Sequence, residues 1–433
     1  MKKINSEYIP HHDLPDNLEV KDDFKKIYNL MEYSNQNMFI TGKAGSGKTT
    51  LLEYFRINSL KNFIILASTG ISAIKAKGKT IHSFFLFPPR ILINEKIQRL
   101  SSKVIGKVDT ILIDECSMIR SDILDGIDQS LKLNRRNEDS FGGVQLILLG
   151  DLYQLPPVVR SNEEEIFNNF YPNGHFFYNA NCYENSQIKT YELEKVYRQK
   201  DHVFLDLLNK IRLAEISQDD LFVINRRVIS DRSEVPNQTI ILSPTNRKVD
   251  SINNMNLENI KSDSFFYKSI QTGDFKEKPA DELLELKVGA QVMMVKNDLK
   301  YPKRWVNGSI GIVHQLDENS IHVKIKKKVY NIPKDNWERF NYSIKDGEVK
   351  HEVVATYTQY PIKLAWAVTI HKSQGQTYEN VIIDLDSGSF AQGQTYVALS
   401  RATTLEGIYL TRAIRVSDIF LNNRFYHSNN YLN

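Results

Sequence analysis

Residues 38–49 read Met38-Phe39-Ile40-Thr41-Gly42-Lys43-Ala44-Gly45-Ser46-Gly47-Lys48-Thr49. An apolar run is followed by Gly42, four further residues and Gly47-Lys48-Thr49, which is the pattern of a phosphate-binding loop. Glycines let successive backbone N–H groups point at one anion, and a helix starting near Lys48 adds the positive end of its dipole. We expect Lys48 to reach the β- and γ-phosphates of a nucleotide and Thr49 to bind Mg²⁺. The predicted nucleotide-binding residues are Gly42, Ala44, Gly45, Ser46, Gly47, Lys48, Thr49 and Thr50.

Short apolar runs elsewhere in the chain alternate with polar segments that are long enough to form helices. They lie at residues 63–68, 110–113, 145–149, 239–242, 381–383 and 408–410. Continuous apolar strands separated by helices are typical of parallel sheets that are covered on both faces. The alternation therefore predicts an α/β protein in two halves, each built on a parallel sheet.

Residues 259–355 have a different pattern, with strands, glycine and asparagine turns and no segment that reads as a crossover helix. Ile321, Val323 and Ile325 alternate with polar residues, so one face of that strand is buried and the other is solvated. We therefore predict a small antiparallel β-barrel inserted in the second half. A shorter insertion, residues 84–107, interrupts the first half between two strands.

Composition excludes several classes of protein. The chain has 433 residues, of which 41% are hydrophobic and 25% charged, as in globular proteins of several folding units. Its net charge of +4 is too small for the dominant basic face of histone-like DNA-binding proteins. Two cysteines cannot form a disulfide framework or a four-cysteine zinc site. No apolar run approaches the roughly 20 residues of a membrane span, and no secretory signal is visible, so we expect an intracellular protein of the cytoplasm or nucleoid.

Two acids follow the apolar run at residues 110–113. Asp114 can hold Mg²⁺, and Glu115 can polarise the water that attacks a phosphate. Two acids that end a strand are usually a solvated turn, but next to a phosphate loop we interpret them as catalytic. Gln154 follows another strand end, and we expect it to sense the γ-phosphate.

Two arginines of the second half are candidates for contact with the same phosphates, Arg198 and Arg401. Arginine makes planar, bidentate contacts to phosphate and stabilises the charge that develops as the γ-phosphoryl group leaves. A two-lobed ATPase needs cations from its second lobe to connect the nucleotide with lobe closure. We therefore count both arginines among the catalytic residues.

Taken in this order, the segments resemble a superfamily 1 DNA helicase of the PIF-one family, which is related to the RecD-like and Dda-like helicases. Residues 125–145 look like the signature stretch of that family, between its Asp-Glu and Gly-Asp motifs. Residues 150–158, 369–377 and 396–401 also follow the family pattern. The resemblance covers nearly the whole chain.

The resemblance implies two RecA-like P-loop NTPase motor domains with an insertion in each. The implied parts are an N-terminal segment at 1–20, the first motor at 21–180 with a strand-splitting wedge at 84–107, the second motor at 181–258 and 356–433, and an SH3-like accessory domain at 259–355. Translocation would run 5′ to 3′ along single-stranded DNA.

Family roles transfer to the positions that match the family motifs. The implied ATPase site contains Lys48, Thr49, Asp114, Glu115, Gln154, Arg198, Gly375 and Arg401. The implied contacts to single-stranded DNA are Ser68, Thr69, Gly70, His82, Ser83 and Phe84 in the first motor and Pro244, Thr245, Asn246, His371, Lys372, Ser373 and Gln374 in the second. Hydroxyl, amide and backbone N–H groups bind phosphates without reading the base sequence, and an aromatic ring offers a face for base stacking.

The implied activity is ATP- and Mg²⁺-dependent unwinding of duplex DNA from single-stranded/double-stranded junctions, in replication, repair or recombination. G-quadruplex DNA and RNA–DNA hybrids are further candidate substrates, and telomere maintenance is an association of the family. We expect a monomer in solution, because no long heptad or apolar interface stripe is visible. The chain departs from the family pattern at residues 18–24, where the glutamine that reads adenine is missing.

Two other functions fit the same motifs. One is a single-strand translocase or RNA-directed ATPase that does not separate DNA duplexes, and a comparison of DNA with RNA as stimulants of ATP turnover distinguishes it. The other is a nucleic-acid-binding module that uses nucleotide only as a switch. Glu115 argues against a switch, because a switch needs no acid that activates water.

Overall fold

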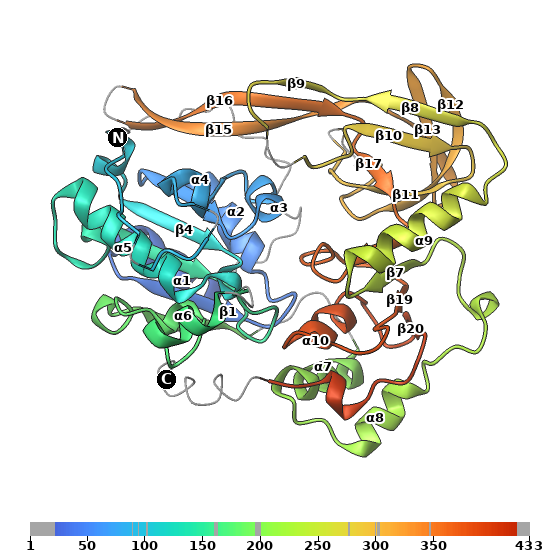
Figure 1. The fold of residues 1–433 in the computed structure, drawn as a ribbon, viewed down its shortest axis with the longest axis horizontal. Helices are drawn as coiled ribbons and strands as arrows, with labels where there is room; N and C mark the ends of the chain where they lie inside the picture. Colours follow the sequence, from blue (N-terminus) through green and yellow to red (C-terminus); the bar gives the residue numbers. More distant parts are fainter. Residues whose placement is uncertain are drawn as a thin grey trace.

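The computed structural model describes residues 22–88, 90–93, 95–100, 103–159, 163–194, 201–275, 278–298, 300, 304–345 and 348–421. Two parallel sheets, one from each half of the chain, lie beside a third part made of antiparallel strands (Figure 1). We call the parts around the two parallel sheets the first lobe and the second lobe. The antiparallel region comprises the strands between residues 264 and 364.

The first lobe is built on a six-stranded parallel sheet with the order β3-β2-β4-β5-β1-β6. Its strands are β1 (Met38–Gly42), β2 (Phe63–Ala67), β3 (Lys79–Thr80), β4 (Thr110–Asp114), β5 (Gln145–Leu149) and β6 (Lys189–Leu193). Neighbouring residues point to opposite faces, so that Phe39 and Ile111 belong to one core cluster, and Ile40 and Leu112 to the other. Burial on both faces explains why these strands are apolar along their whole length.

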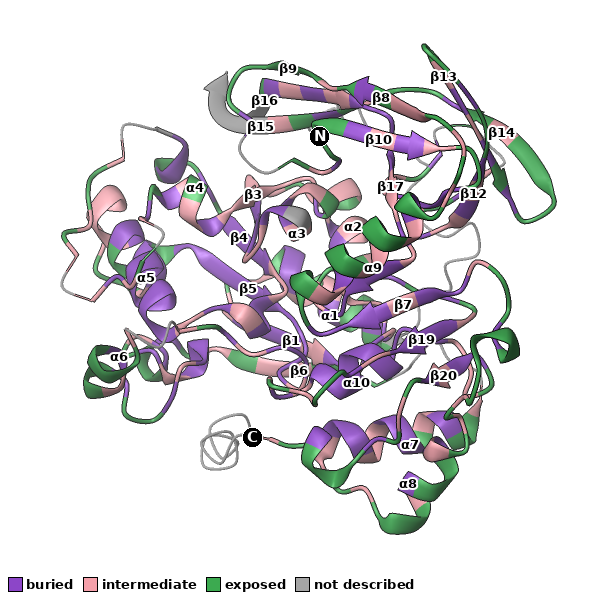
Figure 2. Cartoon of the chain, turned by 45° about the vertical axis from the view of Figure 1, so that its right-hand side comes forward, coloured by how far each residue is buried: buried purple, intermediate pink, exposed green. Residues whose placement is uncertain are grey.

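Helices cover both faces of this sheet. The helices α1 (Asp22–Tyr33) and α2 (Lys48–Asn58) pack on one face, while α4 (Ile81–Phe85) and α5 (Ser121–Arg135) pack on the other. Figure 2 shows that α5 is buried over most of its length. The remaining helical segments of the lobe are α3 (Gly70–Lys75), α6 (Glu164–Phe170), η2 (Lys103–Gly106), η3 (Cys116–Met118), η4 (Ser140–Gly143), η5 (Phe177–Asn179) and η6 (Glu184–Ser186).

The insertion predicted at residues 84–107 starts inside α4 and ends just after η2. Its side chains Phe87, Leu92 and Val104 are buried in the core cluster on the α5 side of the sheet. Part of this segment therefore belongs to the core of the first lobe. Its use as a strand-separating wedge stays a prediction.

The second lobe is built on a four-stranded parallel sheet with the order β18-β7-β19-β20. Its strands are β7 (Ile240–Ser243), β18 (Ala367–Thr369), β19 (Val381–Ile383) and β20 (Ile408–Leu410), and its helical segments are α7 (His202–Leu213), α8 (Gln218–Asn225), η7 (Arg232–Glu234), α9 (Asn246–Glu258), α10 (Gln394–Leu399) and η8 (Val416–Asp418). The sequence predicted neither β18 nor β6. β6 is a partly exposed edge strand with polar residues, and β18 consists of Ala367, Val368 and Thr369, so neither is an apolar run like those of the equally short β19 and β20.

The antiparallel region contains a two-stranded sheet β10-β8, a five-stranded sheet β14-β13-β12-β11-β17 and a three-stranded sheet β15-β16-β9. Its strands are β8 (Ser264–Lys268), β9 (Ile270–Thr272), β10 (Leu283–Lys287), β11 (Gln291–Met294), β12 (Ile310–Asp317), β13 (Ser320–Ile325), β14 (Lys328–Ile332), β15 (Asp335–Lys345), β16 (Glu348–Gln359) and β17 (Ile362–Leu364). Antiparallel pairing thus continues past the predicted boundary at residue 355, since β17 pairs with β11. β15 contacts β3 and η2 of the first lobe, and the long β15–β16 hairpin extends over that lobe (Figure 1).

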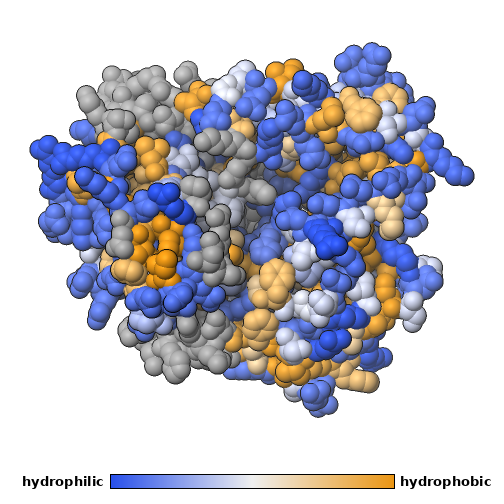
Figure 3. Space-filling view, in the orientation of Figure 1, coloured by the Kyte–Doolittle hydropathy of each residue, from blue (hydrophilic) through white to orange (hydrophobic). Residues whose placement is uncertain are grey.

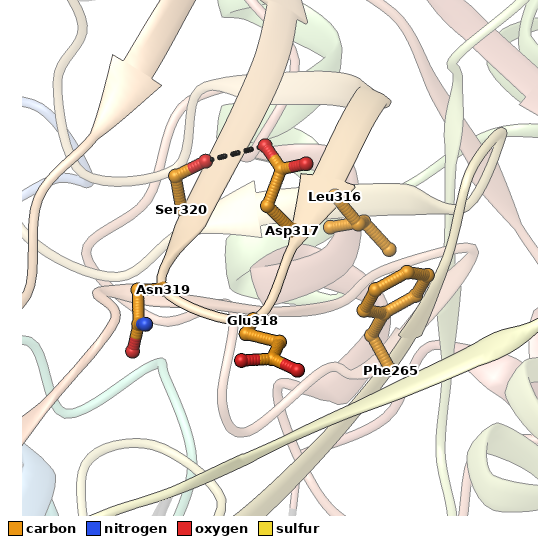
Figure 4. Close-up of a pocket in the computed structure, with 6 residues that line it drawn as sticks. All are labelled: Phe265, Leu316, Asp317, Glu318, Asn319 and Ser320. Carbon is orange, nitrogen blue, oxygen red and sulfur yellow. Dashed lines mark hydrogen bonds between the residues drawn. The ribbon is translucent and has the colours of Figure 1, made fainter.

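The surface in Figure 3 is mostly hydrophilic, with smaller apolar patches between the polar side chains. A surface pocket of about 480 Å³ lies at the turn between β12 and β13, where Phe265 and residues 316–320 line it (Figure 4). This pocket contains none of the predicted site residues. Among the helices of the described ranges, none has the length and apolar character that crossing a membrane requires.

Candidate functional site

The phosphate-loop motif lies between β1 and α2, at the carboxyl end of the strand. Gly45 and Gly47 have φ angles of +83° and +93°, which side chains larger than glycine rarely adopt. Gly47 precedes α2, and no side chain caps the first N–H groups of that helix. The helix N-terminus is therefore open to an anionic ligand.

Lys48 folds back over this loop. Its Nζ donates hydrogen bonds to the backbone carbonyls of Gly42 and Lys43, at 2.6 and 3.1 Å. Burial lowers the pKa of Lys48, and the nearby carboxylate of Asp151 acts in the opposite direction. A phosphate in the loop would favour the charged ammonium. Thr49 lies exposed in the first turn of α2.

The two acids lie at the end of β4, at the same edge of the sheet as the phosphate loop. Asp114 accepts a hydrogen bond from the backbone N–H of Glu115 at 3.0 Å. Burial, and then the charge of Glu115, raises the pKa of Asp114 to about 7. A cation bound beside Asp114 would favour the charged form of this carboxylate.

The oxygen atoms at this edge of the sheet are of the kind that binds Mg²⁺. No group of three or more His, Cys, Asp or Glu side chains that could hold a metal ion occurs in the described part of the chain. Mg²⁺ does not need one, because it takes one or two protein oxygens together with phosphate and water oxygens. The Thr49 hydroxyl and the Asp114 carboxylate are the candidate protein ligands.

A hydrogen bond joins the predicted phosphate sensor to the other lobe. Gln154 is buried, and its Nε2 lies 3.4 Å from Oδ2 of Asp151, which follows the end of β5. Its Oε1 accepts a hydrogen bond of 3.1 Å from Nε2 of Gln374 in the second lobe. The structure thus brings together a residue predicted for the nucleotide and one predicted for single-stranded DNA.

The two predicted arginines have different outcomes. Arg198 lies outside the described residues. Arg401 is only 1% exposed, and its guanidinium donates to the carbonyls of Val397, Ser373 and Gln376 at 2.9, 3.3 and 3.3 Å. All three acceptors belong to the second lobe. Contact of Arg401 with a phosphate stays a prediction, as does that of Gly375, which lies exposed with a φ of +72°.

The predicted DNA contacts of the first lobe lie at the starts of two short helices. The hydroxyl of Thr69 caps α3, accepting from the backbone N–H of Ser72 at 3.2 Å, and Gly70 is the first residue of that helix. Ser68 donates to the carbonyl of Glu115 at 3.2 Å, which places this segment next to the acids. His82, Ser83 and Phe84 lie in α4, where Ser83 is exposed and burial lowers the pKa of His82. The ring of Phe84 packs edge-to-face on Phe85, with ring centroids 4.9 Å apart.

The predicted contacts of the second lobe follow β7 and β18. Thr245 caps α9 by accepting from the backbone N–H of Lys248 at 3.4 Å, between the buried Pro244 and the exposed Asn246. Lys372 is exposed and His371 partly exposed, and burial lowers the pKa of His371. Ser373 is fully buried, and its hydroxyl donates a hydrogen bond of 2.7 Å to the carbonyl of Ile370. In this structure the hydroxyl is therefore not exposed to single-stranded DNA.

Two lysines that the sequence did not single out lie near these contacts. Nζ of Lys75, in the first lobe, donates to the carbonyl of Gln374 at 2.9 Å. Burial, and then repulsion from Lys372, lowers the pKa of the partly buried Lys363 to about 8. An isolated lysine belongs to no sequence motif, so only its neighbours in the structure identify it as a candidate DNA contact.

The comparisons with known proteins agree with these motifs. The family model described as PIF1-like helicase matches residues 17–221, and that of the UvrD-like helicase C-terminal domain matches residues 364–408. The ATP-dependent DNA helicase Pif1 of Bdellovibrio bacteriovorus is 32% identical over 397 residues, covering 87% of this chain and 84% of that protein. Two curated fungal relatives are longer, and the chain spans 63% and 60% of their lengths.

Solved structures extend the likeness over the whole fold. Unliganded Pif1 from Bacteroides sp. superposes with a TM-score of 0.86 at 37% identity, with 96% of each chain covered. A Bacteroides Pif1 bound to ssDNA gives 0.71 at the same 37% identity, with 96% of this chain and 97% of that chain covered. The complex of Bacteroides sp. Pif1 with ADP-AlF4 also gives 0.86, so the arrangement of the parts described above is nearer to the relative without ssDNA than to the relative with it. By sequence and by structure, this chain belongs to the PIF1-like helicase family.

Proposed function

We propose that this chain is an ATP-dependent DNA helicase that moves 5′ to 3′ along single-stranded DNA and opens duplexes at junctions. The observation that carries the proposal is the hydrogen bond between Gln154 and Gln374. It connects the loop after β5, next to the nucleotide edge of the first lobe, with the segment of the second lobe that we expect to hold DNA phosphates. A change at the γ-phosphate can therefore alter the grip on the strand.

The groups for hydrolysis lie along one edge of the first sheet. Loop N–H groups and Lys48 would bind the phosphates of ATP, and Thr49 and Asp114 would hold Mg²⁺. When bound, the ion neutralises charge on the β- and γ-phosphate oxygens. Glu115, beside Asp114, would orient the attacking water and take its proton. Arg198 and Arg401 are proposed as the second-lobe cations.

The finer assignments are part of the same proposal. The β-strands of residues 259–355 would form the SH3-like accessory domain. Residues 84–107 would form the wedge that separates the two DNA strands. We also propose a monomer in solution, with G-quadruplex DNA and RNA–DNA hybrids as further substrates. Support for single-stranded DNA as a ligand comes from the Bacteroides relative whose structure contains it.

Strand displacement with ATP and Mg²⁺ on two duplexes, one with a 5′ tail and one with a 3′ tail, tests the proposal. We expect unwinding from the 5′ tail alone, with Lys48→Ala as the inactive control. Unwinding only from the 3′ tail would contradict the proposed direction. ATP turnover that rises with single strands while neither duplex opens would favour the translocase or RNA-directed ATPase.

A further inference from the structure

A buried polar cluster joins the two lobes next to the phosphate loop. Ala44 and Asp151 contribute from the first lobe, and Arg212 and Tyr396 from the second. The side chains of Asp151, Arg212 and Tyr396 are all less than one-tenth exposed. We call these four residues the cross-lobe cluster.

Arg212, near the end of α7, forms an ion pair with Asp151. Its Nη2 lies 3.1 Å and its Nε 3.3 Å from Oδ1 of that carboxylate. The guanidinium also stacks on the ring of Tyr153, 4.1 Å from the ring centroid. A buried charge that loses its partner is strongly unfavourable, so the position of Asp151 depends on Arg212.

Tyr396, in α10, connects the same carboxylate to the phosphate loop. Its hydroxyl accepts a hydrogen bond of 3.0 Å from the backbone N–H of Ala44 and donates one of 3.3 Å to Oδ2 of Asp151. Burial, and then the charge of Asp151, holds the pKa of Tyr396 well above its ordinary value, so the hydroxyl keeps its proton. A group of the second lobe thus occupies an N–H of the loop predicted to bind phosphate.

The start of α10 confirms how closely the lobes approach here. Gly393 precedes the helix with a φ of +70°. A Cβ at this position would lie 2.3 Å from the carbonyl oxygen of Tyr153 and 2.5 Å from that of Gln154. Only glycine allows the helix to bring Tyr396 to the loop.

We propose that Tyr396 and Arg212 are positioning residues that couple the second lobe to the phosphate loop through Asp151. A phosphate oxygen and the Tyr396 hydroxyl compete for the Ala44 N–H, and any separation of the lobes must break the same contacts. Through Tyr396 and Arg212, nucleotide affinity and ATP turnover therefore depend on the position of the second lobe. The inference rests on the proposed ATPase function.

The test compares Tyr396→Phe with Tyr378→Phe. Tyr378 is also buried in the second lobe, but its hydroxyl contacts the sulfur of Met293 instead of the first lobe. We expect Tyr396→Phe to lower the ssDNA-stimulated kcat about tenfold, which corresponds to about 1.4 kcal/mol. Loss of the competing hydroxyl should also tighten the binding of AMP-PNP about two- to fivefold, a change typical of one hydrogen bond. Tyr378→Phe should leave both values within about twofold of wild type.

Arg212→Met and Arg212→Lys test the second positioning residue. Arg212→Met should also lower kcat about tenfold, and Arg212→Lys should recover part of it, since lysine keeps the charge but not the planar fork. Arg412→Met is the matched control, because Arg412 pairs with Asp418 at 2.8 Å within the second lobe. If Arg212→Met does not fold, Arg212→Lys and Tyr396→Phe decide the outcome.

The double variant separates coupling from two independent effects. Because both residues act on Asp151, the losses in kcat from Tyr396→Phe and Arg212→Met should not multiply. A loss near 100-fold, the product of the two tenfold factors, would overturn the inference. So would AMP-PNP affinity that is the same in Tyr396→Phe and Tyr378→Phe. A wild type without ssDNA-stimulated turnover would instead contradict the proposed function, while the AMP-PNP comparison would still decide the inference.

Discussion

The turn after β1 in the first lobe and the turn after β7 in the second lobe each join a parallel strand to a helix. After β1, glycines leave the first N–H groups of α2 without a side-chain cap. After β7, the hydroxyl of Thr245 caps α9. One helix start is open to an anion, and the other is closed by its own sequence.

This difference indicates that the two lobes, although both are built on parallel sheets, have different functions. The first lobe has the open helix end and, along the same edge, the acids Asp114 and Glu115. The second lobe presents exposed polar residues such as Asn246 and Lys372, and it reaches the first lobe through side chains. We infer that one lobe performs the chemistry while the other responds to it.

The largest expected effect is on ATP turnover, when an acid at a strand end of the first lobe is compared with one at a strand end of the second lobe. Glu115→Gln should lower kcat for ATP by about 10²–10⁴-fold, as expected for loss of a general base, while ATP binding is kept. Asp384 follows β19 in the second lobe and lies 3.6 Å from Nζ of Lys248. Asp384→Asn should change kcat less than about twofold, because the partners of this partly buried carboxylate, Lys248 and Thr411, both belong to the second lobe. Steady-state ATPase assays with saturating ssDNA measure both values, and similar losses in the two variants would remove the division between the lobes.

Substitution of Arg401 tests whether this residue contacts the phosphates of ATP or only stabilises the fold of the second lobe. Its removal takes the Arg401 donor from the carbonyl of Gln376, while the carbonyl of Ser373 keeps its hydrogen bond from the backbone N–H of Gln376, so Arg401→Ala should destabilise the protein by about 1–3 kcal/mol. We expect hydrolysis to stop while ssDNA binding stays nearly intact. Urea unfolding, ATPase and ssDNA titration measure the three quantities. Loss of ssDNA binding together with hydrolysis would show that the residue acts in folding.

The sequence predicts those parts of the site that are continuous in the chain. Lys48, Asp114 and Glu115 follow apolar strands of one parallel sheet, and such strand ends meet at one edge, so their proximity follows from topology. Arg212 and Tyr396 gain their importance from how the lobes pack, which no local pattern encodes. The carbonyl contacts of Arg401 were missed because they join α10 to the segment after β18 within the second lobe, and folding alone brings these two segments together.

The cap of α9 provides a smaller test of the two helix starts. Thr245→Ala should cost about 0.5–2 kcal/mol in unfolding free energy, as typical for loss of an N-cap. Ser217→Ala is the control, because Ser217 caps α8, which carries none of the predicted DNA contacts. Both variants should lose stability, but only Thr245→Ala should weaken ssDNA binding, measured by fluorescence anisotropy. Equal ssDNA affinity in the two would place the strand elsewhere.

The smallest expected effect is the pH dependence of ssDNA affinity that arises from the charge of Lys363. The pKa of Lys363 is lowered to about 8, so this lysine loses its proton as the pH rises through 8. A DNA phosphate favours the charged form, and binding then takes up a proton. The affinity for ssDNA should therefore be level below pH 7 and fall above pH 8, by at most about tenfold per pH unit for one linked proton. Anisotropy titrations at constant salt measure this slope, and Lys363→Met should flatten it. A slope as steep in that variant as in wild type would assign the proton to another group and leave Lys363 without a part in binding.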